Sequence, residues 1–489
     1  MTTLLGIDIG TTSIKAALFA VDAPGVPLAV ASRASPTRMP APGQSETDPL
    51  AVRAAIADCV RELTGGGRGA EVGAVGVSGT ACGAWLLRDG LPVRPAILWN
   101  DGRAAAITDR WREDGRMAAI FDISGNAPFP GYTLPVLRWL AEHEPDNLSR
   151  ATHLVCCKDF VRGWLTGTWT TEESDASYAP FDIVARDWSA SLFDLTETKA
   201  SAHLLPRLSP PDRTDPLLAA VAEDLGLRPG IAVAMGATDI VAGCVGGGAV
   251  AAGHAVTILG TSANSSIVTD RPEFEPRGIG IMAAAPLGRW VRTMVNTSGS
   301  MTLDWAAGLF TGGDVGALFT RAALAQDQDI PVLLPYLADA GVISPFVDAR
   351  ARGAFVGLRV GHDAAAMCRA VVDGLAFAVA DCYRAMPGMV SRITAVGGAA
   401  RSDLLLQTIA DATGAQVLRP KGEEFGARGV ALLAALHSGL MTAGAFEQRA
   451  ADLELARQFL PGPRAADVAA RFARYRDCVR DTRSTGRLW

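Results

Sequence analysis

Two aspartates, Asp8 and Asp239, each follow an apolar stretch and lie close to a glycine. Asp8 stands two residues before Gly10, where a carboxylate could hold Mg²⁺, directly or through water, beside bound phosphates. Asp239 lies between Gly236 and a predicted helix that begins near Ile240, and a carboxylate there can accept a proton from an alcohol. Both aspartates are candidate metal ligands. Aspartate is also a preferred helix N-cap residue, and the local sequence allows that role for Asp239 equally well.

A Gly-Thr-Thr/Ser turn occurs once in each half of the chain, at Gly10, Thr11 and Thr12 and again at Gly260, Thr261 and Ser262. Such a turn presents backbone N–H groups and hydroxyls in a small space, which suits phosphate oxygens. Any β-hairpin favours Gly and Thr at its turn, so one such loop is weak evidence. The chain has no GxxxxGK[ST] motif and no GxGxxG after its first strand, so any phosphate must be held in another way.

A third glycine-containing turn follows a predicted strand at 393–396. Gly397, Gly398 and Ala399 carry almost no side chain, and Ser402 begins the next predicted helix. Bare backbone at the end of a strand lets a flat adenine ring lie close, although a plain β–α turn explains the pattern nearly as well. The segment is therefore a candidate adenosine site.

These candidate residues must be positioned by regular elements, and the two Gly-Thr turns each join a pair of apolar, β-rich segments. The first pair is 3–9 and 13–21, and the second is 255–259 and 264–268. The same hairpin pattern in each half predicts a duplicated architecture.

Helices and strands alternate through the rest of the chain. This alternation predicts an α/β fold with helices packed on mixed sheets, and the length of 489 residues favours two domains, 1–247 and 248–489. Apolar residues at helical spacing predict helices at 49–64, 104–113, 134–144, 215–224, 364–384, 402–413, 426–438 and 465–480. Further strands are predicted at 72–77, 231–234 and 416–418.

The composition excludes several classes of protein. Apolar residues make up 49% of the chain and the net charge is −6 without a basic block, so we expect a globular protein that does not bind nucleic acid. The segment 240–269 lacks charged side chains, but its glycines and His254 make it a poor membrane span. The eight cysteines form no CxxC pair, and with no signal peptide expected, they predict reduced, mostly buried thiols in a cytoplasmic protein.

Taken together, these motifs resemble the FGGY carbohydrate kinases, a family related to actin, hexokinase and the heat-shock chaperone ATPases. The matching segments occur in the family's order along nearly the whole chain. They are Gly6 to Thr11, Ile97 to Arg103, Gly236 to Gly243, Gly260 to Ser262, Gly353 to Leu358, Met367 to Asp373, and Gly397, Gly398, Ala399 and Ser402.

The resemblance implies two actin-like, ribonuclease H-like ATPase domains with ATP and Mg²⁺ in the cleft between them. Asp239 would be the general base that deprotonates the sugar hydroxyl, and Asp8 would lie near the metal. The ATP-binding residues carried over are Gly10, Thr11, Thr12, Lys15, Gly260, Thr261, Gly299, Ser300, Gly398, Ala399 and Ser402. The substrate-binding residues carried over are Thr80, Ala81, Cys82, Trp99, Asn100, Asp101 and Asp239.

The substrate follows less directly from the resemblance. Thr80, Ala81 and Cys82 stand where xylulokinases commonly have Gln, Met and His, so a hydrogen-bonding group is lost from the sugar pocket. Val136 and Ala366 also depart from the family pattern, as does the segment 341–343. The leading hypothesis is a pentulose kinase for D- or L-xylulose. Erythritol, glycerol, ribulose and hexuloses stay open as substrates.

Two readings from other classes compete with the kinase. One is a non-catalytic sugar or nucleotide sensor of the same fold, which would tolerate the loss of Asp8 or Asp239. The other is an ATPase that acts on a protein. The match of residues 99–103 to the family's sugar-site segment argues against it. Trp85 and Trp99 could each form an apolar wall for sugar carbons or lie in the core. The sequence leaves open whether the chain forms a homodimer.

Overall fold

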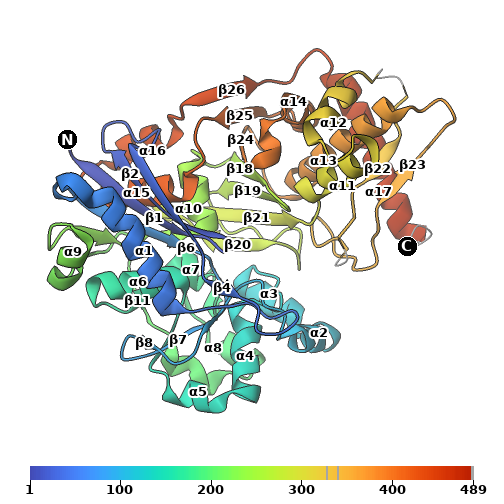
Figure 1. Ribbon diagram of the computed structural model, residues 1–489. Helices are drawn as coiled ribbons and strands as arrows, with labels where there is room; N and C mark the ends of the chain where they lie inside the picture. Colours follow the sequence, from blue (N-terminus) through green and yellow to red (C-terminus); the bar gives the residue numbers. More distant parts are fainter. Residues whose placement is uncertain (326–328, 339–340, 486–489) are drawn as a thin grey trace.

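The computed structural model describes residues 1–325, 329–338 and 341–485. Two lobes are built around two separate mixed β-sheets, with helices packed on them (Figure 1). The first lobe holds the blue to green part of the chain, and the second holds most of the yellow to red part. The predicted α/β class is confirmed.

The first sheet is assembled around the N-terminal hairpin. Its strand order is β15, β16, β6, β1, β2, β3, and β17 pairs with β6 beyond the end of β16. The hairpin strands β1 and β2 are antiparallel, whereas β1 and β6 are parallel. The strands are β1 (Thr3–Ile9), β2 (Ser13–Ala20), β3 (Ala29–Ala34), β6 (Val72–Gly79), β15 (Thr214–Pro216), β16 (Ala232–Ala234) and β17 (Ala237–Thr238).

The second sheet repeats this plan around the other hairpin. Its order is β20, β21, β19, β18, β24, β25, β26, with β18 antiparallel to β19 and parallel to β24. The predicted duplication is therefore present as two sheets with the same arrangement around their central hairpins. The strands are β18 (His254–Leu259), β19 (Ala263–Thr269), β20 (Ile281–Ala284), β21 (Trp290–Asn296), β24 (Arg392–Val396), β25 (Gln416–Pro420) and β26 (Leu455–Phe459).

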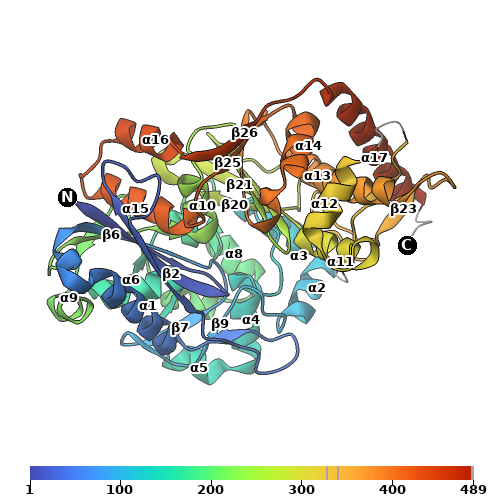
Figure 2. The ribbon, with the colours of Figure 1, turned by 45° about the horizontal axis from the view of Figure 1, so that its top comes forward.

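The helices follow the apolar spacing of the sequence closely. In α1 (Pro49–Thr64), Val52, Ile56, Val60 and Leu63 are buried, and the helix contacts β2 and β3. In the second lobe, Figure 2 shows α11 to α14 grouped near α17. These helices are α11 (Ser300–Phe310), α12 (Val315–Ala323), α13 (Ala364–Ala385), α14 (Asp403–Thr413) and α17 (Ala465–Thr485).

The first lobe also carries a mainly helical region between β6 and β15, which extends away from the sheet (Figure 1). It supplies part of the candidate substrate site. Its helices are α2 (Ala105–Glu113), α3 (Arg116–Ser124), α4 (Thr133–His143), α5 (Pro145–Arg150), α6 (Cys157–Thr166), α7 (Glu173–Ala176) and α8 (Ala190–Leu195).

Two helices, α10 (Asp239–Gly246) and α15 (Phe425–His437), join the lobes. They pack against each other, and α15 also packs on β1 and β6 of the first sheet. The approach is close because glycines lie at the contacts: a side chain at Gly246 would meet the carbonyl of Phe425, and one at Gly429 would meet that of Ala242. A helix from the second half of the sequence thus covers the first sheet. The division of the chain into domains at residue 247 stays a prediction.

One predicted helix is wrong at its start. The segment 215–224 was expected to be helical throughout, but β15 occupies Thr214–Pro216 and α9 begins only at Ala219 (Ala219–Leu225). Asp215 belongs to the strand, where its carboxylate contacts Arg162 and Arg213. Pro216 follows, and a proline inside a helix would remove a backbone hydrogen bond.

The cysteines and the uncharged segment 240–269 agree with expectation. All eight cysteines are free thiols, and all except Cys478 are buried. The segment folds into α10, β18 and β19 with their connections. Across residues 1–325, 329–338 and 341–485, no helix has the length and apolar character needed to cross a membrane.

Candidate active site

The candidate site begins where parallel strands of the first sheet end side by side. In the register of these strands, Asp8 of β1 lies opposite Ser78 of β6, and Ser78 lies opposite Ala237 of β17. Asp239 follows β17 directly as the first residue of α10. Since carboxyl ends of neighbouring parallel strands meet at one edge, the fold brings Asp8 and Asp239 to one place.

Asp239 does not cap its helix through its side chain. The N-cap residue of α10 is Thr238, and the carboxylate of Asp239 accepts a hydrogen bond from the N–H of Ile240 at 2.8 Å. Burial and then the negative charge of Asp8 raise the pKa of Asp239 to about 7, while the N–H groups of Ile240 and Ala81 act in the opposite direction. A pKa near neutrality suits a general base.

Asp8 is the second carboxylate at this edge. Burial raises the pKa of Asp8 to about 6, and Ser78 and Lys15 oppose this rise. Among the described residues no group hydrogen-bonds to its Oδ1 atom. A side chain at Gly426, in the first turn of α15, would collide with this carboxylate. Asp8 therefore has a buried carboxylate oxygen that no described residue pairs with.

The first hairpin turn makes one backbone hydrogen bond within itself and one side-chain hydrogen bond with Trp99. The N–H of Gly10 donates to Ser13 O at 3.0 Å, and the indole N–H of Trp99 donates to the hydroxyl of Thr11 at 2.8 Å. Lys15, on β2, forms an ion pair with Glu424 at 3.1 Å. The turn residues Gly10, Thr11 and Thr12 are at least partly exposed, which leaves them free to meet phosphate.

The second hairpin turn is packed against the predicted ATP residues Gly299 and Ser300. The N–H of Ser300 donates to the carbonyl of Gly260 at 2.7 Å. A side chain at Gly299 would collide with the carbonyls of Gly260 and Thr261. The second turn and the segment at Gly299 and Ser300 therefore lie in contact, and their role in binding ATP stays a prediction.

The predicted adenosine segment also reaches the second hairpin. Gly397 has φ 97°, and a side chain there would meet the backbone of Leu259, one residue before Gly260. Gly398 and Ala399 begin a short 3₁₀ turn, and Ser402 caps α14 by accepting a hydrogen bond from Leu405 N at 3.3 Å. All predicted ATP residues of the second half thus lie around the ends of β18 and β24.

On the sugar side, Thr80, Ala81 and Cys82 follow β6 and are buried. The N–H of Thr80 donates to Ile9 O at 3.0 Å, which ties this turn to the end of β1. Burial, together with the charges of Asp239 and Asp175, raises the pKa of the Cys82 thiol well above its ordinary value. A raised pKa keeps the Cys82 thiol neutral, which disfavours a role as nucleophile, and its contact with substrate stays a prediction.

The segment that contains Asn100 and Asp101 divides into exposed and buried parts. Trp99 is 43% exposed and Asn100 is exposed, so both can meet a ligand. Asp101 is buried, and its carboxylate accepts hydrogen bonds from Ser45 N at 2.6 Å and from Arg103 Nε at 2.8 Å. These contacts give Asp101 a structural role, and its direct contact with substrate stays a prediction.

Sequence reasoning missed a buried charged cluster behind the site. Lys158 Nζ lies 2.6 Å from Asp159, 3.0 Å from Asp175 and 3.4 Å from Glu172, and all four side chains are almost fully buried. The signal was present: Lys158 is one of four lysines in an arginine-rich chain and stands beside an aspartate in an otherwise apolar segment. Trp85, considered for the pocket wall, is a core residue whose ring is tilted against that of Phe160.

The two sheets, the two hairpins and the paired carboxylates define an actin-like ATPase fold of the sugar kinase type. The models of the FGGY family of carbohydrate kinases match this chain along most of its length: the N-terminal domain at residues 3–246 and the C-terminal domain at residues 255–438. The chain belongs to this family, and it is a carbohydrate kinase that transfers a phosphoryl group from ATP to an alcohol.

Individual relatives are similar over most of their length. A xylulose kinase of Klebsiella pneumoniae is 34% identical over 439 residues, which cover 88% of this chain and 89% of that protein. An erythritol kinase of Brucella abortus is 29% identical over 463 residues, 89% of this chain and 87% of that protein. A crystal structure described as a "xyloylose kinase" from Brucella ovis has a TM-score of 0.90 at 28% identity and covers 99% of both chains.

Proposed function

We propose that this kinase phosphorylates a hydroxyl of a pentulose such as D- or L-xylulose, with Asp239 as the general base. The observation that carries the proposal is the placement of Asp239: a carboxylate with a pKa near 7, at a strand-to-helix turn, beside Asp8 and the predicted sugar residue Ala81. The names of relatives such as the Klebsiella xylulose kinase support the substrate class.

The placement of Asp239 accounts for the chemistry of such a transfer. At pH values above its pKa, Asp239 is ionised and accepts the proton of the substrate hydroxyl while the oxygen attacks the γ-phosphorus of ATP. N–H groups of the two Gly-Thr turns would hold phosphate oxygens, and closure of the lobes would keep water out. Trp99 offers an apolar face next to Thr11, at the junction of the predicted sugar and phosphate sites.

Mg²⁺ fits the residues present. Proteins bind Mg²⁺ through one or two carboxylates, with phosphates and water supplying the other oxygens. Asp8 has a buried oxygen without a hydrogen-bond partner among the described residues, and the charge of Asp8 acts on the carboxylate of Asp239 from nearby. When bound, Mg²⁺ would neutralise charge on the transferred phosphoryl group.

A second candidate function is a kinase for another small polyol or ketose. Thr80, Ala81 and Cys82 lack the hydrogen-bonding His of xylulokinases, and the erythritol kinase of Brucella abortus is 29% identical. A non-catalytic sensor is disfavoured because Asp8 and Asp239 are both retained and share one site. A homodimer and a cytoplasmic location remain predictions.

A panel of alcohols tests the proposal. ADP release would be followed with D-xylulose, L-xylulose, D-ribulose, erythritol, glycerol and gluconate, each against a water background. We expect one pentulose to raise ADP release most strongly. A stronger response to erythritol or glycerol would move the assignment to the polyol alternative. No response to any compound, with ATP binding intact, would favour the sensor.

A further inference from the structure

The strand-to-helix turn that carries Asp239 is held by one side chain from another element. The backbone N–H of Thr238, the residue before Asp239, donates to the hydroxyl of Ser174 at 3.0 Å. Ser174 and Thr238 are both buried, so leaving the N–H of Thr238 without a partner would cost free energy. We propose that Ser174 is a positioning residue that fixes Asp239 for proton transfer, an inference that rests on the proposed role of Asp239.

The hydroxyl of Ser174 has its orientation fixed by Glu172. Ser174 Oγ donates to Glu172 Oε1 at 2.5 Å, and the backbone N–H of Ser174 donates to Glu172 Oε2 at 2.7 Å. A hydroxyl has one proton, and here it points to the carboxylate. The lone pairs of Ser174 Oγ are therefore directed away from Glu172 and accept the N–H of Thr238.

Glu172 is anchored in turn by the buried charged cluster. Lys158 Nζ lies 3.4 Å from Glu172 Oε1 and neutralises part of the negative charge of the cluster. The stem of Lys158 lies beside Gly236, where a side chain would come within 3.2 Å of its Cδ atom. The chain of contacts runs from Lys158 through Glu172 and Ser174 to Thr238, the residue before Asp239.

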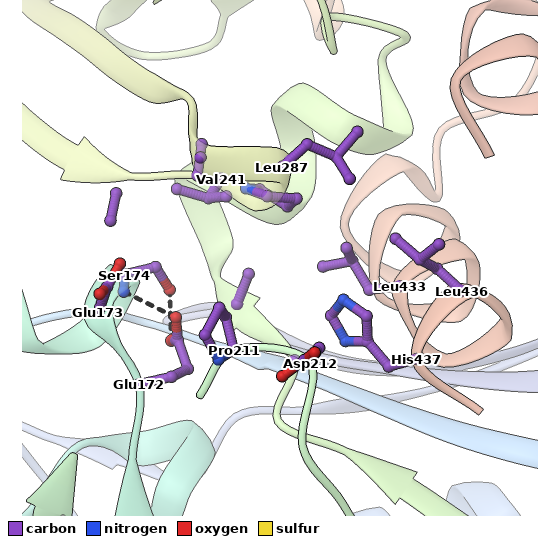
Figure 3. Close-up of a pocket in the computed structure, with 16 residues that line it drawn as sticks. Glu172, Glu173, Ser174, Pro211, Asp212, Val241, Leu287, Leu433, Leu436 and His437 are labelled. Atoms are coloured by element: carbon purple, nitrogen blue, oxygen red, sulfur yellow. Dashed lines mark hydrogen bonds between the residues drawn. The ribbon is translucent and has the colours of Figure 1, made fainter. Parts of the chain in front are cut away.

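A cavity next to this contact makes the hydrogen bond between Thr238 and Ser174 important. Figure 3 shows Glu172 and Ser174 on one wall of a space of about 480 Å³, with Leu433, Leu436 and His437 of α15 across from them. Gly236 and Ala237, which lead into the turn, also line it. Because this face of the turn borders open space rather than packed side chains, the turn can shift when Ser174 no longer holds it.

The test compares Ser174→Ala with Ser177→Ala. Ser177 lies three residues further on, is also buried, and its hydroxyl accepts a backbone N–H, that of Ala284, at 3.1 Å. The two variants lose the same kind of hydrogen bond, but only one of these bonds reaches the turn before Asp239. We expect Ser174→Ala to lower kcat about 10- to 100-fold with little change in either KM, since small misplacements of a catalytic group cost that much.

Ser177→Ala should keep kcat within about twofold, and Ser174→Thr, which retains the hydroxyl beside the cavity, should keep most of the wild-type kcat. All variants are measured with the compound to which the wild type responds best, and melting temperatures verify that they fold. A kcat of folded Ser174→Ala within twofold of the wild type would overturn the inference. So would an equal loss of kcat in Ser177→Ala. A wild type inactive on every compound would instead count against the proposed function.

Discussion

The two hairpin turns occupy equivalent places in their sheets but differ in length and in the groups around them. In the first, Gly10 N donates to Ser13 O at 3.0 Å, and in the second, Gly260 N donates to Ser262 O at 3.1 Å. Two residues before the glycine, however, the first hairpin has Asp8 and the second has Ile258. We infer that the first turn serves the reacting end of ATP and the second serves nucleotide binding.

The difference shows how one fold can be used twice for separate tasks. The register of each sheet places its turn at the same edge, next to the end of a parallel strand. The task of each turn depends on its side chains: carboxylates with raised pKa values gather at the first turn, and small residues such as Gly299 and Gly397 gather at the second. Function therefore lies in the grafted site rather than in the repeated backbone.

The largest expected effect comes from removing the base at the first turn. Asp239→Asn should lower sugar-dependent ADP release about 100- to 10,000-fold, because general-base catalysis contributes that much. ATP binding, measured by calorimetry, should persist. Asp314→Asn is the matched control, since Asp314 caps α12 by accepting Ala317 N at 3.0 Å and lies outside the site. Equal activity of Asp239→Asn and Asp314→Asn would refute the assignment.

Asp8→Asn should lower activity about 100-fold and raise the Mg²⁺ concentration that is required, because a carboxylate near the phosphates is lost.

Asp8→Asn should also shift the pH dependence of kcat/KM. The charge of Asp8 helps to raise the pKa of Asp239 to about 7, so the wild-type kcat/KM should rise with pH to a plateau above pH 7. Without that charge the midpoint should shift to lower pH. An unchanged midpoint would show that the two carboxylates do not interact.

At the second turn, Gly299→Ala should act on nucleotide binding. The added methyl group would collide with the carbonyls of Gly260 and Thr261 and displace the turn. We expect KM for ATP to rise about tenfold, roughly 1.4 kcal/mol, with a smaller change in kcat. Gly308→Ala, in α11 where a new methyl group meets open space, is the control and should leave KM unchanged. If both variants have a similar KM for ATP, the second turn does not take part in ATP binding.

The smallest effect concerns stability. Asp239 has a folded-state pKa of about 7 against an ordinary value of 3.8, so the folded state holds a proton that the unfolded state releases between these values. The wild type should therefore lose stability as pH rises from about 4 to 7, and Asp239→Asn should not. Above pH 7 the variant should be more stable by about 1–2 kcal/mol, after allowance for solvent at the cleft.

Thermal unfolding at pH 5 and pH 8 would measure this difference. The gain in melting temperature of Asp239→Asn over the wild type should be larger at pH 8. Asp314→Asn, which changes an exposed helix cap, should shift the melting temperature by a similar amount at both pH values. A gain that is the same at pH 5 and pH 8 would mean that the carboxylate of Asp239 is not destabilised by burial.

Local patterns predicted the elements well, because they depend on near neighbours along the chain. Both ends of α1 and the turns of both hairpins follow from apolar spacing and glycine positions. Long-range packing had no such signal. The position of α15 on the first sheet, the pairing of Lys15 with Glu424, and the contact of Ser174 with Thr238 join residues far apart in the sequence. The predicted start of the helix at 215–224 was wrong because residues 214–216 form a short edge strand.

The measurement that tests the central claim most directly is the formation of a sugar phosphate. Wild-type protein would be incubated with ATP, Mg²⁺ and the compound that most increases ADP release, and the products identified by mass spectrometry. The account predicts one phosphorylated sugar in equal amount to ADP, and none with Asp239→Asn. ADP without a phosphorylated sugar, or equal product from both proteins, would contradict it.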